Sequence, residues 1–303
     1  MSRAAVVVNP IKIDDLELFK KDVCAALARH GWEEPMWRQT TPADPGSGQA
    51  AEAAEAGVDL VMAAGGDGTV TACAAGLAGK PVPLAILPAG TGNLLAVNLG
   101  VPLDLALAVE VALTGTDRKI DLGVANGRPF VAMAGLGLDA KMLRSTSEAA
   151  KKRFGYAAYV LAILRHVGDP PLRIAVRTDG GRPKKYSATG VIVGNVGWLH
   201  GGIRLLPDAQ PDDGLLDAAV LTSRGLVGSI TLGLRILLRR DGAQVVRGSF
   251  RSLRIRVDRE HLWELDGEVL GTTKELKVGL YHEKLLLRVP AGLRLVRPQA
   301  KRR

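Results

Sequence analysis

The sequence has 303 residues, of which 47% are apolar and 23% are charged, so disordered, collagen-like and coiled-coil chains are excluded. This length favours two domains. Lys and Arg outnumber Asp and Glu by 40 to 31, and the resulting net charge of +9 favours anionic partners: nucleotides, nucleic acid or an anionic membrane face.

The first third of the chain alternates between strand and helix patterns. Short apolar runs predict strands, and longer stretches with helical spacing or many alanines predict helices. Such alternation is typical of a parallel sheet with helices on its faces. The predicted strands are 3–8, 35–40, 59–64 and 83–87, and the predicted helices are 14–30, 48–57, 70–78 and one that begins at Leu94.

From about residue 119 the pattern changes to short strands separated by turn residues, which is typical of an antiparallel sandwich. We therefore predict an α/β domain over 1–118 and a β-sandwich domain over 119–303, with the last residues packing back on the first domain. Two predicted helices, 148–167 and 224–240, interrupt the strands. The strands are 118–125, 129–134, 172–178, 186–196, 215–221, 244–248, 252–258, 261–265, 269–271, 275–280 and 284–289.

A glycine-rich loop, Gly65-Gly66-Asp67-Gly68-Thr69-Val70, lies between a buried strand and a helix. Glycines there let backbone N–H groups approach phosphate oxygens, and the helix directs its positive end to the same place. An aspartate beside phosphates is explained if Mg²⁺ lies between them. A tight turn without a ligand is the alternative. The loop lacks the Gly-Lys-Ser/Thr of a P-loop.

A second loop, Pro88-Ala89-Gly90-Thr91-Gly92-Asn93, follows the next predicted strand and begins another helix. By itself it fits a capped turn, with Asn93 as the N-cap, equally well. In an open parallel sheet, however, loops at neighbouring strand ends form one crevice. The two loops together therefore favour a nucleotide site.

The order of these motifs resembles that of the diacylglycerol kinase-like lipid kinases, whose catalytic domain is shared with sphingosine and ceramide kinases. The resemblance covers nearly the whole chain. It implies an α/β nucleotide domain followed by a β-sandwich, with the active site in the cleft between them. Further matching pieces are Asn9-Pro10, Thr41, Gly135-x-Gly137-x-Asp139-Ala140, Asp212 to Asp217 and Asp266-Gly267-Glu268.

The resemblance also implies roles for individual residues, with ATP and Mg²⁺ as cofactors. Thr40 competes with Thr41 for one nucleotide position, and Asp139 is expected near the lipid substrate. Glu268 is implied as the general base, with Asp266 as the second candidate, although Asp-Gly alone also fits a hairpin turn. The implied nucleotide ligands are Asn9, Thr41, Gly65, Gly66, Asp67, Gly68, Thr69, Val70, Gly90, Thr91 and Asn93, and the implied metal ligands are Gln210, Asp213, Leu215 and Asp217.

The expected activity is transfer of the γ-phosphate of ATP to a lipid hydroxyl, with diacylglycerol as the first acceptor and phosphatidic acid as product. Three alternatives stay open. The acceptor could be a sphingoid base or another lipid alcohol. NAD kinases share the Gly-Gly-Asp-Gly-Thr loop, so a soluble acceptor is the second alternative. The third is a regulatory nucleotide-binding protein.

The expected location is the cytoplasm, peripheral at the inner membrane face. No stretch reaches the ~18 apolar residues of a membrane span, and two cysteines favour a reducing compartment. The apolar segment 225–240 has a basic end and could lie at a membrane interface or pack as a core helix. Aromatic residues are 4% of the chain, which argues against nucleic acid as a partner. A homodimer stays open.

Overall fold

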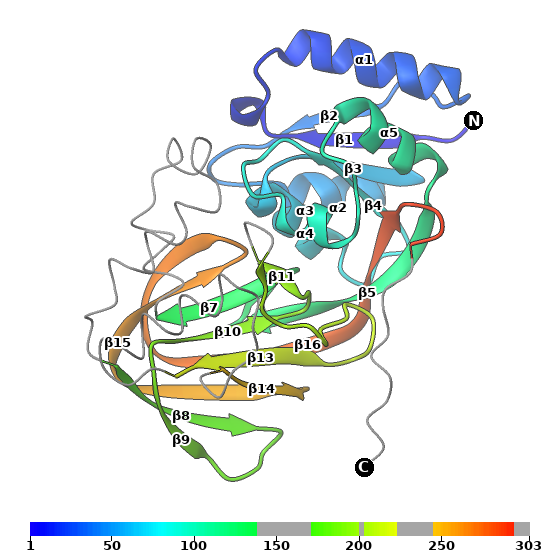
Figure 1. Cartoon of the computed structure of the whole chain (residues 1–303). Coiled ribbons are helices and arrows are strands. Elements are labelled where there is room, and N and C mark those ends of the chain that lie inside the picture. Colours follow the sequence, from blue (N-terminus) through cyan, green and yellow to red (C-terminus); the bar gives the residue numbers. More distant parts are fainter. Residues whose placement is uncertain (138–170, 200–202, 223–244, 294–303) are drawn as a thin grey trace. The chain divides into compact units, whose positions relative to one another are not determined.

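The computed structural model describes residues 1–137, 171–199, 203–222 and 245–293 (Figure 1). The chain divides into two compact units, and each is described by itself. The first unit contains Met1–Leu122 and a C-terminal segment that begins at His282, and the second contains Gly123–Tyr281. The predicted domain boundary, after residue 118, lies within strand β5 (Thr116–Ala125).

The first unit is an α/β domain built on parallel strands. Its strands lie side by side in the order β2, β1, β3, β4, and Leu287 of β16 (Glu268–Val289) pairs with Leu84 of β4, again in parallel. The elements are β1 (Ala4–Val8), the 3-10 turn η1 (Pro10–Lys12), α1 (Leu16–Arg29), β2 (Met36–Gln39), α2 (Ser47–Glu55), β3 (Leu60–Gly65), α3 (Asp67–Leu77), β4 (Leu84–Pro88), α4 (Leu94–Asn98) and α5 (Leu105–Thr114).

Helices cover both faces of this sheet: α1 and α5 lie over one face, and α2 and α3 over the other (Figure 1). Every residue of β1 and β3 is therefore buried, as expected for strands of a parallel sheet between two helical layers. Asp15 and Asp104 cap α1 and α5 by accepting hydrogen bonds from Leu18 N and Leu107 N. The helix α5 is an addition to the elements predicted from the sequence.

The second unit is an antiparallel β-sandwich. One run of neighbouring strands is β14-β13-β10-β7-β15, and another is β9-β8-β15-β16. Its apolar core includes Phe130, Leu136, Ile255 and Leu276. The remaining strands are β6 (Arg128–Phe130), β7 (Met133–Gly137), β8 (Leu172–Thr178), β9 (Lys184–Ala188), β10 (Gly190–Gly194), β11 (Trp198–Leu199), β12 (Ile203–Arg204), β13 (Leu216–Leu221), β14 (Val245–Phe250) and β15 (Leu253–Leu265).

Two long strands replace several short ones that the sequence predicted. The predicted runs 252–258 and 261–265 form one strand, β15, whose pairing with β16 shifts between Arg256 and His261. The runs 269–271, 275–280 and 284–289 likewise form the single strand β16. Irregular pairing of this kind bends a strand without ending it. The charged run from Asp258 to Glu260 and Gly271 therefore mark bends in these strands, not turns between strands.

The predicted helices 148–167 and 224–240 lie outside the described residues. Within the described part of the chain, no helix is long and apolar enough to cross a membrane.

Candidate active site

Three segments meet at the carboxyl ends of the parallel strands in the first unit. Asn9 follows β1, Gly65 ends β3, and Ala89 follows β4. The backbone N–H of Asn9 donates to Ala64 O at 2.8 Å, and that of Ala89 donates to Gly65 O at 2.9 Å. This edge of an open parallel sheet is where such folds bind ligands.

The backbones of the two glycine-rich loops touch each other at Gly66 and Gly90. A Cβ atom added to Gly90 would lie 2.5 Å from Gly66 Cα and 2.9 Å from Asn93 Oδ1. One added to Gly65 would lie 2.6 Å from the side chain of Thr69. Both glycines are thus required by close packing. As a result, the two loops lie against each other, as expected of loops that follow neighbouring parallel strands.

The side chain of Asn93 holds the second loop in shape. Its Oδ1 accepts a hydrogen bond from Gly90 N at 2.9 Å, and its Nδ2 donates to Gly90 O at 2.8 Å. Asn93 itself has φ 47°, in the left-handed region that asparagine tolerates. It occupies the N-cap position of α4, as predicted, but its side chain bonds to the loop and not to the helix.

Asp67 joins the two loops. It begins α3, and its Oδ1 accepts a hydrogen bond from the backbone N–H of Leu94, the first residue of α4, at 2.5 Å. Burial raises the pKa of Asp67 from 3.8 to about 6, while the backbone N–H groups near Leu94 oppose that rise. Asp67 is therefore a half-buried acid that keeps its proton to a higher pH than an exposed aspartate does.

Asn9 and Thr69 link the first strand to the first loop. Asn9 Nδ2 donates to Thr69 Oγ1 at 3.4 Å, and Asn9 Oδ1 accepts from Ile11 N at 3.1 Å. Thr69 is buried, as is its neighbour Val70, whereas Gly68 and Thr91 are exposed at the surface of the loops. The exposed positions are the ones that a bound nucleotide could contact directly.

Thr40 and Thr41, which competed for one nucleotide position, differ in exposure. Thr40 is buried, and its N–H donates to Val8 O at 2.9 Å. Thr41 is exposed, and its Oγ1 accepts from Asp44 N at 3.1 Å. The hydroxyl of Thr41 thus lies at the surface after β2, near the strand ends that carry the loops.

In the second unit, Asp266 is locked by backbone hydrogen bonds. Its carboxylate accepts from the N–H groups of Val131, Ala132 and Met133 at 2.8–2.9 Å, and its own N–H donates to Met133 O at 2.8 Å. Asp266 is buried and has φ 46°. This carboxylate fixes the turn between β15 and β16.

Glu268, two residues further on, is exposed at the start of β16. The turn that precedes it is held from both sides, because Glu264 Oε2 also accepts from Gly267 N at 2.8 Å. The turn therefore presents the carboxylate of Glu268 from a rigid support. Sequence reasoning missed Glu264, a buried carboxylate two residues before the predicted triplet.

The predicted metal ligands lie in and before β13. Asp213 Oδ1 accepts from Leu215 N at 2.9 Å, and Asp217 Oδ1 accepts from Ser249 Oγ at 2.7 Å. Burial raises the pKa of Asp217, and the Ser249 hydroxyl opposes that rise. Gln210, which lies three residues before Asp213 in the sequence, is buried. Among the described residues, no group of three or more His, Cys, Asp or Glu side chains gathers as a metal site.

Comparisons with known proteins match both units. A model described as the diacylglycerol kinase catalytic domain matches residues 3–125, and one described as the YegS C-terminal NAD kinase beta sandwich-like domain matches residues 132–278. A Pseudomonas aeruginosa protein named "Probable lipid kinase YegS-like" is 37% identical over 259 residues, 81% of this chain and 82% of that protein. The chain belongs to the YegS and diacylglycerol kinase family of lipid kinases.

One further relative agrees with this family, and two solved structures share the fold. A Bacillus subtilis diacylglycerol kinase is 28% identical over 296 residues, 93% of this chain and 94% of that protein. A crystal structure of a diacylglycerol kinase from Bacillus anthracis shares the fold, with a TM-score of 0.75, 24% identity and coverage of 97% and 98%. An NAD kinase from Archaeoglobus fulgidus in complex with ATP shares the fold more distantly, with a TM-score of 0.50, 14% identity and coverage of 94% and 93%.

Membership of this lipid kinase family confirms the predicted resemblance and the predicted fold class. It also makes ATP the implied phosphate donor, since the catalytic domain of a kinase matches the first unit. One residue with an expected role, Asp139, lies outside the described residues, as does segment 225–240.

Proposed function

We propose that this lipid kinase phosphorylates diacylglycerol, using ATP and Mg²⁺, and so forms phosphatidic acid. The observation that supports this most is the joined pair of glycine loops at the strand ends of the first unit. Their contact at Gly66 and Gly90, and the bond from Leu94 N to Asp67, support a single preformed surface of backbone.

Phosphoryl transfer needs positioning and charge stabilisation more than covalent help from the protein. In the proposal, the backbone N–H groups of the exposed residues Gly68 and Thr91 bind the phosphates at the amino end of α3. The hydroxyl of Thr41 contributes to nucleotide binding from the end of β2. Asn9 and Asn93 act as positioning residues, because their side chains shape the loops.

Glu268 is the proposed general base. A base must reach the acceptor hydroxyl, and an exposed carboxylate on a fixed turn suits that task. Asp266, the second candidate, has its carboxylate engaged by three backbone N–H groups, which supports a positioning role for it. The proton of the lipid hydroxyl passes to Glu268 as the oxygen forms its bond to the γ-phosphorus of ATP, and ADP leaves.

Magnesium is proposed near Asp213 and Asp217, with Gln210 and the carbonyl of Leu215 as further ligands. All of these donors are oxygen atoms, the ligand type that Mg²⁺ prefers, so the residues fit the ion. Bound there, Mg²⁺ would supply charge neutralisation for the phosphates. The hydrogen bonds of Asp213 to Leu215 N and of Asp217 to Ser249 orient these carboxylates.

A substrate panel tests the proposal. The protein is incubated with γ-labelled ATP, with and without Mg²⁺, and with diacylglycerol, a sphingoid base or NAD in separate reactions. We expect label in the diacylglycerol reaction with Mg²⁺ and none after EDTA. Label in the sphingoid base or NAD reaction, with none in diacylglycerol, would contradict the proposed acceptor, and label in no reaction would favour a regulatory role.

A further inference from the structure

One face of the sandwich in the second unit is lined with cations. Along β15, buried Leu253, Ile255 and Val257 alternate with exposed residues, and β8 shows the same alternation. Alternate residues of a strand point to opposite faces, so the exposed set faces away from the core. The neighbouring strands β9 and β16 add residues to the same face, and we name the charged residues of this face the basic sheet face. Among the described residues of the four strands, its members are Arg173, Arg177, Lys185, Arg254, Arg256 and Lys277, with Asp258 and Glu275 as its carboxylates.

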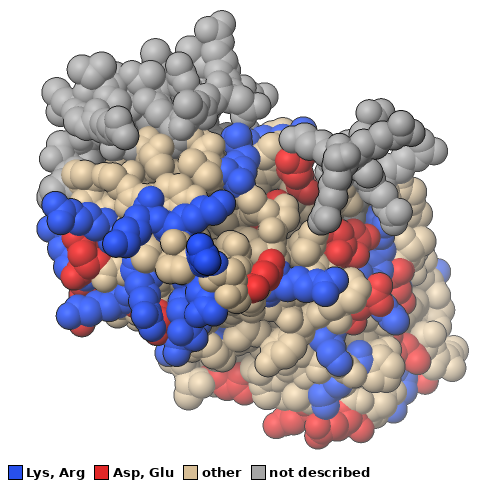
Figure 2. Space-filling view, turned by 90° about the horizontal axis from the view of Figure 1, so that it is seen from below, with Lys and Arg blue, Asp and Glu red and all other residues tan. Residues whose placement is uncertain are grey.

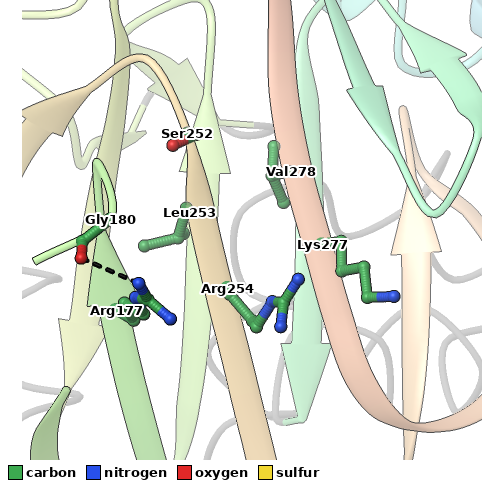
Figure 3. Close-up of a pocket in the computed structure, with 7 residues that line it drawn as sticks. All are labelled: Arg177, Gly180, Ser252, Leu253, Arg254, Lys277 and Val278. Carbon is green, nitrogen blue, oxygen red and sulfur yellow. Dashed lines mark hydrogen bonds between the residues drawn. The ribbon is translucent and has the colours of Figure 1, made fainter.

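Three of these cations stand in one row across three strands. Arg254 of β15 is directly opposite Arg177 of β8 and directly opposite Lys277 of β16. Figure 3 shows the three side chains on their neighbouring strands. Like charges directly opposite each other destabilise a sheet. The row therefore costs folding stability unless an anion offsets it.

A single carboxylate offsets this charge in part. Glu275 Oε1 lies 2.9 Å from Arg256 Nε and 3.6 Å from Arg254 Nε, and its Oε2 lies 3.6 Å from Lys277 Nζ. The hydrogen bond from Arg256 lowers the pKa of Glu275, so this carboxylate is ionised at neutral pH. One carboxylate facing three cations leaves a surplus of positive charge. In Figure 2, Lys and Arg gather toward the left of the face seen, where acidic side chains are few.

The row lines a pocket of about 320 Å³, whose walls are Arg177, Gly180, Ser252, Leu253, Arg254, Lys277 and Val278 (Figure 3). This volume is at the lower end of the range of roughly 300–1,000 Å³ for small-molecule sites.

The rim of the pocket is ordered by hydrogen bonds. Arg177 Nη2 donates to Gly180 O at 2.8 Å. Asp179 Oδ1 accepts from the N–H groups of Arg251 and Ser252 at 2.9 and 2.8 Å. The hollow is therefore a preformed concavity beside three cationic side chains.

We propose that the basic sheet face docks on an anionic membrane, with a phosphate-bearing lipid headgroup in this pocket. A headgroup phosphate would supply the negative charge that the row of three cations lacks, and long Arg and Lys side chains can reach headgroups while their stems stay on the sheet. The choice of a membrane rests on the proposed lipid acceptor. Docking itself is measured without ATP, so it can fail or succeed independently of catalysis.

A nucleic acid is the other common polyanion, and the structure favours it less. Single-strand binding uses aromatic side chains on which bases stack. One exposed aromatic ring, Tyr281, lies on the same side of β16 four residues beyond Lys277, whereas stacking of successive bases requires several. Double-stranded DNA is read by an element that enters a groove, whereas this surface is the hollowed outer face of a sheet.

Vesicle co-sedimentation without ATP tests the proposal. The full chain is mixed with vesicles of equal parts phosphatidylglycerol and phosphatidylcholine, or of phosphatidylcholine alone. We expect binding to the anionic vesicles only. The variant Arg254→Gln/Lys277→Gln should lower that binding by about 10- to 30-fold, from the contribution of each surface cation. The matched control, Lys21→Gln/Arg29→Gln, removes two exposed charges from α1 and should bind like the wild type.

The melting temperature distinguishes a docking role of the row from a structural one, because loss of residues that stabilise the fold would lower it. Arg254→Gln/Lys277→Gln removes the repulsion along the row together with two exposed ion pairs to Glu275 that each contribute little, so it should melt at the same temperature as the wild type or higher. Loss of binding together with a lower melting temperature would overturn the proposal. So would unchanged binding, an equal loss in the control variant, or equal binding to phosphatidylcholine.

Two competition experiments identify the source of the anion. Millimolar inorganic phosphate should displace the protein from anionic vesicles only weakly, since the membrane offers many phosphates at once. Tight phosphate binding without vesicle binding would overturn the lipid source. Binding of a duplex DNA oligonucleotide that the double variant abolishes, without vesicle binding, would assign the face to nucleic acid instead.

Discussion

At the scale of single residues, two aspartates, one in each unit, have different surroundings. Asp67 is half-buried, its pKa is raised to about 6, and it accepts a hydrogen bond from Leu94 N. Asp266 is buried, and its carboxylate accepts hydrogen bonds from three backbone N–H groups. The raised pKa of Asp67 fits its proposed place beside the nucleotide, and the three hydrogen bonds of Asp266 fit a structural role.

Replacement of Asp67 should show how much its ionised carboxylate lowers the stability of the fold. The folded chain holds the Asp67 proton up to about pH 6, whereas the unfolded chain releases it near 3.8. This contribution to stability is complete below pH 3.8 and is lost as the pH rises through 6. At pH 7.5 we expect Asp67→Asn to be as stable as the wild type or more stable by about 1 kcal/mol. Urea unfolding at a series of pH values measures this, and a pH-independent difference would contradict it.

Asp266→Asn should lower the free energy of unfolding strongly, whereas Glu268→Gln should leave it nearly unchanged. The amide at position 266 turns one acceptor oxygen into a donor that faces backbone N–H groups, so we expect a loss of about 2–4 kcal/mol. Glu268 is exposed, and its replacement should change the unfolding free energy by no more than about 0.5 kcal/mol. Chemical denaturation of both variants measures this. Equal stability of the two would refute the structural role of Asp266.

At the scale of elements, the two loops act as one unit because their backbones touch. Gly90→Ala would place Cβ 2.5 Å from Gly66 Cα, so the loops must separate. We expect a loss of about 1–3 kcal/mol in stability and weaker ATP binding. Gly248→Ala is the control, because a Cβ there meets nothing within 4 Å. Calorimetric titration with ATP compares the two, and equal affinities would contradict the joined-loop site.

The sequence predicted the elements that local patterns specify. The buried strand before Gly65 and the glycines after it were enough to predict a strand, a loop and a helix in the right places. The hydrogen bond from Leu94 N to Asp67 joins residues 27 positions apart, and a local pattern does not reveal which groups meet. Only the general rule that neighbouring strand ends meet predicted that the loops would be close.

The long strands show where local reasoning fails. Gly271 and the charged run from Asp258 to Glu260 are typical of turns, yet β15 and β16 continue through them because pairing with the partner strand resumes. The three bonds to Asp266 come from residues more than 130 positions earlier, so the sequence alone left it open as a base. The row of Arg177, Arg254 and Lys277 likewise requires the strand register.

At the scale of the whole molecule, each unit contributes a separate part of the proposed chemistry. The parallel sheet of the first unit supplies the joined loops for ATP, and the sandwich of the second supplies Glu268, the proposed metal ligands and the basic sheet face. The family match covers both units. A phosphoryl transfer enzyme built this way should lose nucleotide binding through changes in the first unit, and turnover alone through Glu268.

The most direct test of the account is the steady-state rate of ATP-dependent diacylglycerol phosphorylation by the wild type and by Glu268→Gln, with Glu260→Gln as the control for another exposed carboxylate of the second unit. We predict that Glu268→Gln lowers kcat at least about 100-fold, the lower range for loss of a general base, while the KM for ATP stays unchanged. The control should resemble the wild type. Retained turnover in Glu268→Gln would contradict the account.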